Sequence, residues 1–135
     1  MTLPFLNRLK KRGLKRLPIE EKARTFLAQA DEMYRQKYWD IASNRYYYAC
    51  FHAVQALLIH NGLSVRTHDG LITAFGLHFV KTGKVESRLG AFLSRMEQLR
   101  EKGDYNCIYT VSEDEISTMA EPAKELIEKI EKLLG

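Results

Sequence analysis

The chain is poor in the residues that build covalent or metal-held frameworks. Its 135 residues include two cysteines, Cys50 and Cys107, which are too few for a disulfide framework or a zinc site. No apolar run approaches the ~20 residues that a membrane-spanning helix needs. Basic residues interrupt the apolar ones in 1–18, so no secretory signal is predicted. These absences favour one domain in a reducing, cytoplasmic environment.

Acidic residues are absent from the start of the chain, where six basic residues gather before Glu20. When these six are removed from the 21 basic residues of the chain, 15 remain against 17 acidic ones. The rest of the chain is therefore not a basic nucleic-acid binder by composition. The sequence predicts a basic N-terminal arm, 1–17, ahead of a helical domain, 18–135. The leucines of the arm suit a membrane surface or a phosphate backbone, and a solvated tail is the alternative that Gly13 favours.

Apolar residues recur at helical spacing, and no convincing alternation of period two marks a strand. This pattern predicts helices over 18–37, 40–60, 69–82, 85–102 and 112–134. Because the connections are short, we expect an all-α fold, an up-and-down bundle of about five helices with a four-helix core.

Local signals predict the ends and faces of these helices. Ser112 and Glu115 form a capping box before the last helix, in which Pro122 indicates either a kink or a later start. We expect Gly103-Asp104-Tyr105 to end the fourth helix. Outward-pointing arginines are expected on that helix at Arg88, Arg95 and Arg100. A stripe of small residues on the second helix predicts close approach of a neighbour: Ala42, Ala49, Ala53 and Ala56.

The second predicted helix carries the most informative pair, Arg45 and His52, seven residues apart. Seven residues are nearly two turns, so both side chains leave the same face, about 10 Å apart along the axis. A fixed cation with a titratable imidazole suits the handling of a phosphodiester. The alternative, which the spacing alone favours, is a helix that buries and satisfies its histidine. A two-fold dimer would bring a second copy of each residue alongside.

Aromatic residues and further histidines surround this pair. Tyr46, Tyr47 and Tyr48 face most of the way round the helix; a base stacks on an exposed tyrosine, but packing in the core is the favoured alternative. Thr67-His68-Asp69-Gly70 predicts a helix start, with His68 near the site. No histidine has the i, i+4 spacing or companion carboxylate of a helical zinc site, so neither a metal nor a cofactor is predicted.

Arg45-Tyr46-Tyr47-Tyr48-Ala49-Cys50-Phe51-His52-Ala53 resembles the R-x-Y-Y-A-x-F-H-A signature of HEPN domains (higher eukaryotes and prokaryotes nucleotide-binding), and of their small stand-alone prokaryotic branch in particular. Further segments match in order: Asn61-Gly62-Leu63 with Thr67-His68-Asp69-Gly70, then 75–83, then 99–105 with Gly103 in place of the usual alanine. The match covers about residues 20–134.

The resemblance implies a helical bundle that commonly dimerises. Many HEPN proteins are metal-independent ribonucleases in which two protomers pool the residues of an R-x(4–6)-H motif. Many are encoded beside a minimal nucleotidyltransferase, as toxin and antitoxin. Arg45 and His52 fit the longest spacing of that motif, while Tyr46 departs from the polar residue that active forms usually carry after the arginine.

Two hypotheses follow for the function. In the first, the protein is an endoribonuclease acting on RNA as a homodimer, with Arg45 and His52 as catalytic residues. Supporting or substrate-binding roles are expected for Tyr46, Tyr48, His68, Asp104 and Tyr105. In the second, the same face docks a nucleotide or protein, and the chain is a non-catalytic module partnered with a nucleotidyltransferase. An open cleft shared by two protomers favours the first; a His52 that is buried and hydrogen-bonded within one bundle favours a structural role and a partner protein.

Overall fold

The structure, a computed structural model, describes residues 18–105 and 110–135, with side chains up to Gly103 and from Thr110. The predicted basic arm, 1–17, and Cys107 lie outside these residues. The described residues form helices and their connections only, which confirms the predicted all-α fold. The elements are α2 (Pro18–Arg35), α3 (Trp39–His60), α4 (His68–Phe75), a π-helical segment η1 (Gly76–Val80), α5 (Ser87–Tyr105), α6 (Glu113–Ser117) and α7 (Ala120–Leu134).

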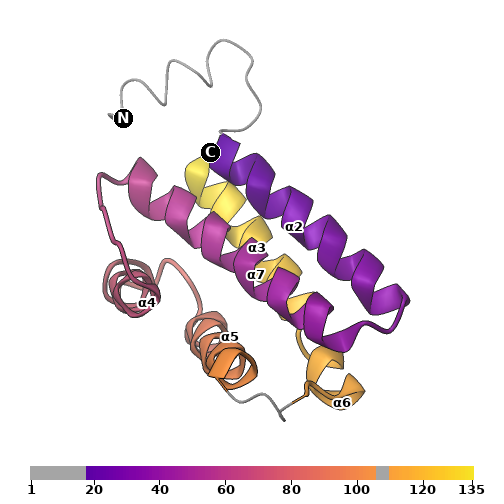
Figure 1. Cartoon of the computed structure of the whole chain (residues 1–135). Helices are drawn as coiled ribbons and strands as arrows, with labels where there is room; N and C mark the ends of the chain where they lie inside the picture. The colour runs from indigo at the N-terminus through magenta and orange to yellow at the C-terminus, as the bar shows by residue number, and fades with distance from the viewer. Residues whose placement is uncertain (1–17, 106–109) are drawn as a thin grey trace.

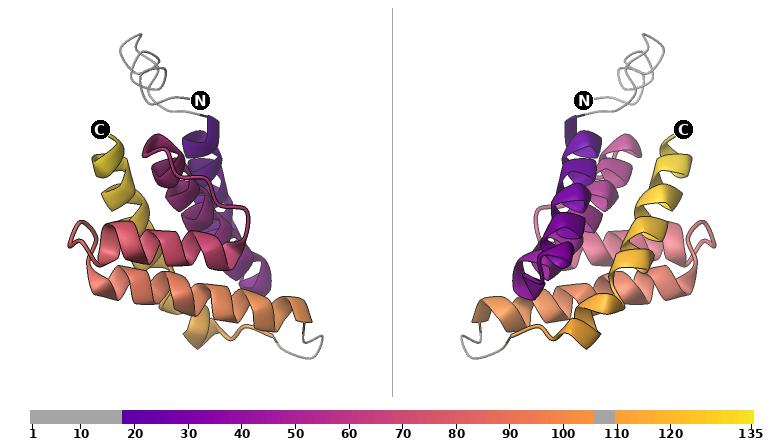
Figure 2. Two further views of the ribbon diagram at one scale, coloured as in Figure 1. Left: turned by 90° about the vertical axis from the view of Figure 1, so that its left-hand side faces the viewer. Right: turned by 90° about the vertical axis from the view of Figure 1, so that its right-hand side faces the viewer.

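The helices of the bundle run in two directions that cross each other (Figures 1 and 2). Helices α2 and α3 run antiparallel and side by side, and α7 lies along them, while α4 and α5 run side by side across this group. Helix α3 is the centre of the arrangement because it packs against α2, α7, α5 and α4. Among the described residues, no helix is both long and apolar enough to cross a membrane.

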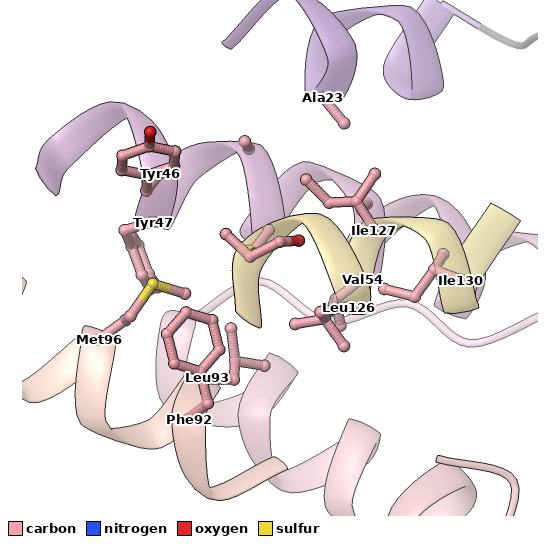
Figure 3. Packing of buried hydrophobic residues seen from close by; sticks show 14 of the residues in the cluster. Ala23, Tyr46, Tyr47, Val54, Phe92, Leu93, Met96, Leu126, Ile127 and Ile130 are labelled. Carbon is pink, nitrogen blue, oxygen red and sulfur yellow. The ribbon is translucent and has the colours of Figure 1, made fainter. Parts of the chain in front are cut away.

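Small side chains explain how α3 serves as the centre of the bundle. The predicted alanine stripe of α3 is buried as expected, and it lets α2 and α7 approach closely: Ala42, Ala49, Ala53 and Ala56. Figure 3 shows larger side chains filling the rest of the core. Val54 of α3 lies among the apolar side chains of α7, and Tyr47 of α3 points toward Met96 of α5.

Capping residues set the helix starts that the sequence predicted. The Thr67 hydroxyl accepts the Gly70 N–H at 2.9 Å and begins α4. Ser112 and Glu115 form the predicted capping box at α6. Pro122 marks a later helix start and not a kink, because α6 ends at Ser117 and α7 begins at Ala120. Pro122 then occupies the first turn, where its missing N–H costs nothing.

Two expectations for the fourth helix are wrong. Helix α5 does not end at Gly103 but continues to Tyr105, since one exposed glycine costs a helix only about 1 kcal/mol. Arg100 does not point outward: its side chain is 11% exposed and pairs with Glu97. Arg88 and Arg95 are exposed as predicted. The third predicted helix is also split, because its second half, η1, widens into a π-helical turn.

Lys37 ends the turn after α2 in a backbone conformation that suits glycine. Its φ is +66°, and its N–H donates to the Tyr34 carbonyl at 3.0 Å in a C-terminal capping turn. We expect Lys37→Gly to stabilise the protein by about 0.5–1 kcal/mol, because glycine has no Cβ to strain at positive φ. Urea denaturation measures the change, and Lys37→Ala is the control. An equal gain in the alanine variant would mean that removal of the lysine, not backbone relief, is responsible.

Candidate functional site

Arg45 and His52 of α3 share one neighbour, Phe26 of α2. The Arg45 guanidinium lies 5.1 Å from the centroid of the Phe26 ring, and the His52 ring lies 5.2 Å from the same centroid, edge to face at 86°. Both side chains therefore leave α3 toward α2, on one face, as the seven-residue spacing predicts. Phe26 stacks under the cation and supports the imidazole.

Lys22, which was not predicted from the sequence, is a second cation beside Phe26. Lys22 lies one turn before Phe26 on α2, and its ammonium group is 5.9 Å from the Phe26 centroid. Within the described part of the chain, neither Lys22 nor Arg45 makes an ion pair, and Arg45 donates only to the Asn44 side-chain oxygen at 2.8 Å. Four other arginines each bind a carboxylate: Arg24, Arg35, Arg88 and Arg100. The charge around Phe26 is thus positive, and no described residue neutralises it.

His52 is held almost entirely inside the bundle. It is 9% exposed, and its Nδ1 lies 3.2 Å from the Gln55 side-chain oxygen. Burial lowers the pKa of His52, and the nearby Lys22 charge lowers it further, against the raising effect of Gln55. The ring is therefore neutral near pH 7. This burial is the arrangement expected of a structural histidine, and the neutral ring is also the form that a general base requires.

A buried charged cluster lies next to this face, formed by Tyr47, His68, Glu97 and Arg100. The Tyr47 hydroxyl is 2.6 Å from His68 Nδ1, and a Glu97 oxygen is 3.5 Å from the same nitrogen. Arg100 donates two hydrogen bonds to Glu97, at 2.7 and 3.2 Å. Burial acts to raise the pKa of Glu97, but hydrogen bonds from Arg100 and Tyr47 outweigh it and lower that pKa. Glu97 therefore stays ionised although its side chain is only 6% exposed.

Two rings connect the charged cluster to the Arg45 and His52 pair. Tyr48 and Phe51 are half-buried, and each contacts both His52 and His68. We call Phe26, Tyr48, Phe51, His52 and His68 the aromatic face. Tyr48 and His68, which the sequence placed near the site, thus lie beside His52.

Tyr46 does not belong to the aromatic face. It is 1% exposed, and its hydroxyl donates to the Asp31 carboxylate of α2 at 2.6 Å; burial, with Asp31 adding to it, raises its pKa. Figure 3 shows its ring on a different side of α3 from Tyr47. Tyr46 therefore lies apart from the other predicted site residues, and its contact with a substrate stays a prediction. Asp104 and Tyr105, the other predicted supports, have side chains outside the described residues.

The position of Tyr46 leads to a test of its role. We expect Tyr46→Phe to destabilise the fold by about 1.5–3 kcal/mol, because a buried hydrogen bond to a charged group is lost. Urea denaturation measures the loss, and Tyr34→Phe, a half-buried tyrosine of α2, is the control. A variant as stable as the parent would contradict the hydrogen bond to Asp31.

Three carboxylates among the described residues lie close enough together to share a cation. Oxygens of Asp69, Glu97 and Glu101 lie within 4.8 Å of one another. The Arg100 guanidinium already neutralises Glu97 there, so this group resembles an ion-pair network more than a metal centre. The expected absence of a metal remains a prediction.

The structure thus defines an all-α bundle with a cationic, histidine-bearing aromatic face. The HEPN domain family model matches residues 19–133. This chain therefore belongs to the HEPN domain family, and the resemblance drawn from the sequence is confirmed.

Several proteins of bacteria and archaea are similar to this chain. A "UPF0332 protein" of Thermotoga maritima is 39% identical over 113 residues, which cover 84% of this chain and 86% of that protein. Two proteins of Methanocaldococcus jannaschii each carry the name "putative toxin". One is 34% identical over 108 residues, 80% of each chain; the other is 26% identical over 134 residues, 99% of this chain and 90% of that protein.

Proposed function

We propose that this protein is a toxin-like, metal-independent endoribonuclease that acts in the cytoplasm as a homodimer. The observation that carries the proposal is the group around Phe26. There Lys22 and Arg45, two cations without carboxylate partners among the described residues, adjoin the neutral His52. Membership of the HEPN family and the toxin names of two relatives support it.

The chemistry assigned to this group follows from the charge states. The neutral His52 takes the proton of a ribose 2′-hydroxyl, which then attacks the adjacent phosphorus. Arg45 and Lys22 stabilise the negative charge that builds on the phosphate oxygens. His52 is only 9% exposed, so the RNA meets the exposed edge of its ring, and the second protomer completes the cleft beside that edge. The products are a 2′,3′-cyclic phosphate and a 5′-hydroxyl end.

A second function is favoured by a specific observation, the burial of His52 and its bond to Gln55 within one bundle. In this alternative the protein is a non-catalytic module, and the aromatic face docks a nucleotide or a nucleotidyltransferase. The balance of 15 basic and 17 acidic residues outside the arm supports it too, because RNA enzymes normally offer a basic groove.

The test uses end-labelled RNA with the purified full-length protein, in EDTA to exclude metal-dependent contaminants. Cleavage that leaves cyclic phosphate ends supports the nuclease. Arg45→Gln is expected to slow it by about 10²–10³-fold. Arg95→Gln is the matched control, since Arg95 also lies over a phenylalanine ring, that of Phe92 at 5.7 Å, and is exposed. Absence of cleavage, with capture of a nucleotidyltransferase encoded nearby, would favour the second function.

A further inference from the structure

RNA cleavage by a 2′-hydroxyl needs two proton transfers, one to a base and one from an acid to the leaving 5′-oxygen. The proposed site supplies His52 as the base but leaves the acid unassigned within one chain. A general acid supplied by a residue of the same protomer rests on the proposed function.

His68 lies within reach of the same phosphodiester. Its ring centroid is 4.5 Å from that of Phe51, and the His52 centroid is 5.5 Å from Phe51, so the two imidazoles lie at most 10 Å apart. At that upper limit, two hydrogen bonds of about 2.8 Å and a phosphate group span the gap between the rings. Both imidazoles also contact Tyr48, so they belong to one cluster of rings.

The charges around the two histidines differ. A carboxylate lies beside His68, as suits a proton donor, whereas a cation lies near His52, as suits a neutral base. Nδ1 of His68 lies between the Tyr47 hydroxyl and Glu97, at 2.6 and 3.5 Å, so a protonated His68 has an ion-pair partner. His52 has no carboxylate partner among the residues that the structure describes, and Lys22 lies near it. A carboxylate on Nδ1 also fixes the ring and leaves Nε2 for the substrate. The His68 side chain is 32% exposed, which keeps it accessible.

Two further charged residues, Arg100 and Asp69, lie near His68 and Glu97. Arg100 holds Glu97 through two hydrogen bonds and lies 5.6 Å from the Tyr47 ring. Asp69 follows His68 in α4 and is exposed. Buried and held by Arg100 and Tyr47, Glu97 is a fixed acceptor beside the His68 ring.

We propose that His68 is the general acid of the cleavage, oriented by Glu97 and Tyr47. His52 accepts the 2′-hydroxyl proton, the 2′-oxygen bonds to phosphorus, and the bond from phosphorus to the 5′-oxygen breaks. The protonated His68 then gives its Nε2 proton to that leaving oxygen. Proton exchange with water restores the neutral His52 and the protonated His68, so no other reactant is consumed.

The test compares two substrates in the full-length protein. His68→Gln is expected to slow cleavage of labelled RNA by about 10²–10⁴-fold. It should cleave uridine 3′-(p-nitrophenyl phosphate) within about threefold of the parent rate, because nitrophenolate leaves without a proton and needs no acid. His52→Ala should slow both substrates, and His78→Gln, an exposed histidine of η1, should slow neither.

The remaining outcomes show whether the role of His68 fails alone or together with the proposed nuclease. If His68→Gln cleaves RNA as the parent does, or slows both substrates equally, His68 is not the acid and the inference is overturned, while the nuclease stands. If the parent cleaves neither substrate, both proposals fail. Circular dichroism checks the fold of each variant. His68→Asn, whose amide can still bond to the Tyr47 hydroxyl, replaces His68→Gln if the latter is unfolded.

Discussion

Replacing His52 with alanine is expected to slow RNA cleavage by about 10²–10⁴-fold, the usual contribution of a general base. The proposed role rests on the contact of His52 with Phe26, beside which the cations Arg45 and Lys22 also lie. The measurement is the rate of appearance of cyclic phosphate ends on labelled RNA. His78→Ala is the matched control, since it removes an exposed histidine from η1.

The same experiment needs a control for packing, because His52 is buried against aromatic rings. His52→Gln keeps a polar side chain of comparable length and removes the titratable nitrogen. If both variants melt at the parent temperature and both lose activity, the proton transfer is responsible. A His52→Ala variant that cleaves RNA as well as the parent removes His52 from the mechanism.

Under the proposed mechanism, we expect the lowered pKa of His52 to set the pH dependence of RNA cleavage. Because burial holds this pKa below the ordinary value of about 6.5, the ring stays neutral as the pH falls through that value. The acidic limb of the rate profile is therefore displaced to lower pH than for an exposed histidine.

The stability of the fold depends on the same pKa. The stability that the neutral His52 ring contributes is complete above pH ~6.5 and is lost as the pH falls toward the folded-state pKa.

The fold was predictable because its determinants are local. Helical periodicity, the Ser112 and Glu115 capping box and the break before Pro122 all act over a few residues. The seven-residue spacing likewise suffices to put Arg45 and His52 on one face, because it depends only on the helical repeat. The end of the fourth helix was predicted too early, because Gly103 lowers helix stability without forcing an end. The crossing of α4 and α5 over the other helices was not predicted, because it depends on packing that no local pattern encodes.

The buried charged cluster was not predictable in the same way. Glu97 and Arg100 are three residues apart on α5, which is the pattern of an ordinary solvent-exposed ion pair. Tyr47 and His68, both far away in sequence, complete the cluster only after α3, α4 and α5 have packed together. Lys22 was missed for a related reason: its importance comes from Phe26, which brings it to Arg45 on another helix.

The Glu97 and Arg100 pair gives the largest expected effect on stability. Their side chains are 6% and 11% exposed, so removing one partner leaves the other charge buried. We expect Glu97→Ala to destabilise the fold by about 3–5 kcal/mol, whereas the double variant Glu97→Met with Arg100→Met recovers most of that loss. Urea denaturation measures both. Glu101→Ala, an exposed acid on the same helix, is the control and should change stability by less than about 0.5 kcal/mol.

The pH dependence of stability provides an independent check of the same pair. Although burial opposes it, hydrogen bonds from Arg100 and Tyr47 hold the pKa of Glu97 below its ordinary value of about 4.3. The stability that ionised Glu97 contributes is therefore complete above about pH 4.3 and is lost as the pH falls toward the folded-state pKa. The parent should lose stability over that interval more steeply than Glu97→Ala does. Equal slopes, or a Glu97→Ala variant as stable as the parent at pH 7, would contradict a buried and ionised Glu97.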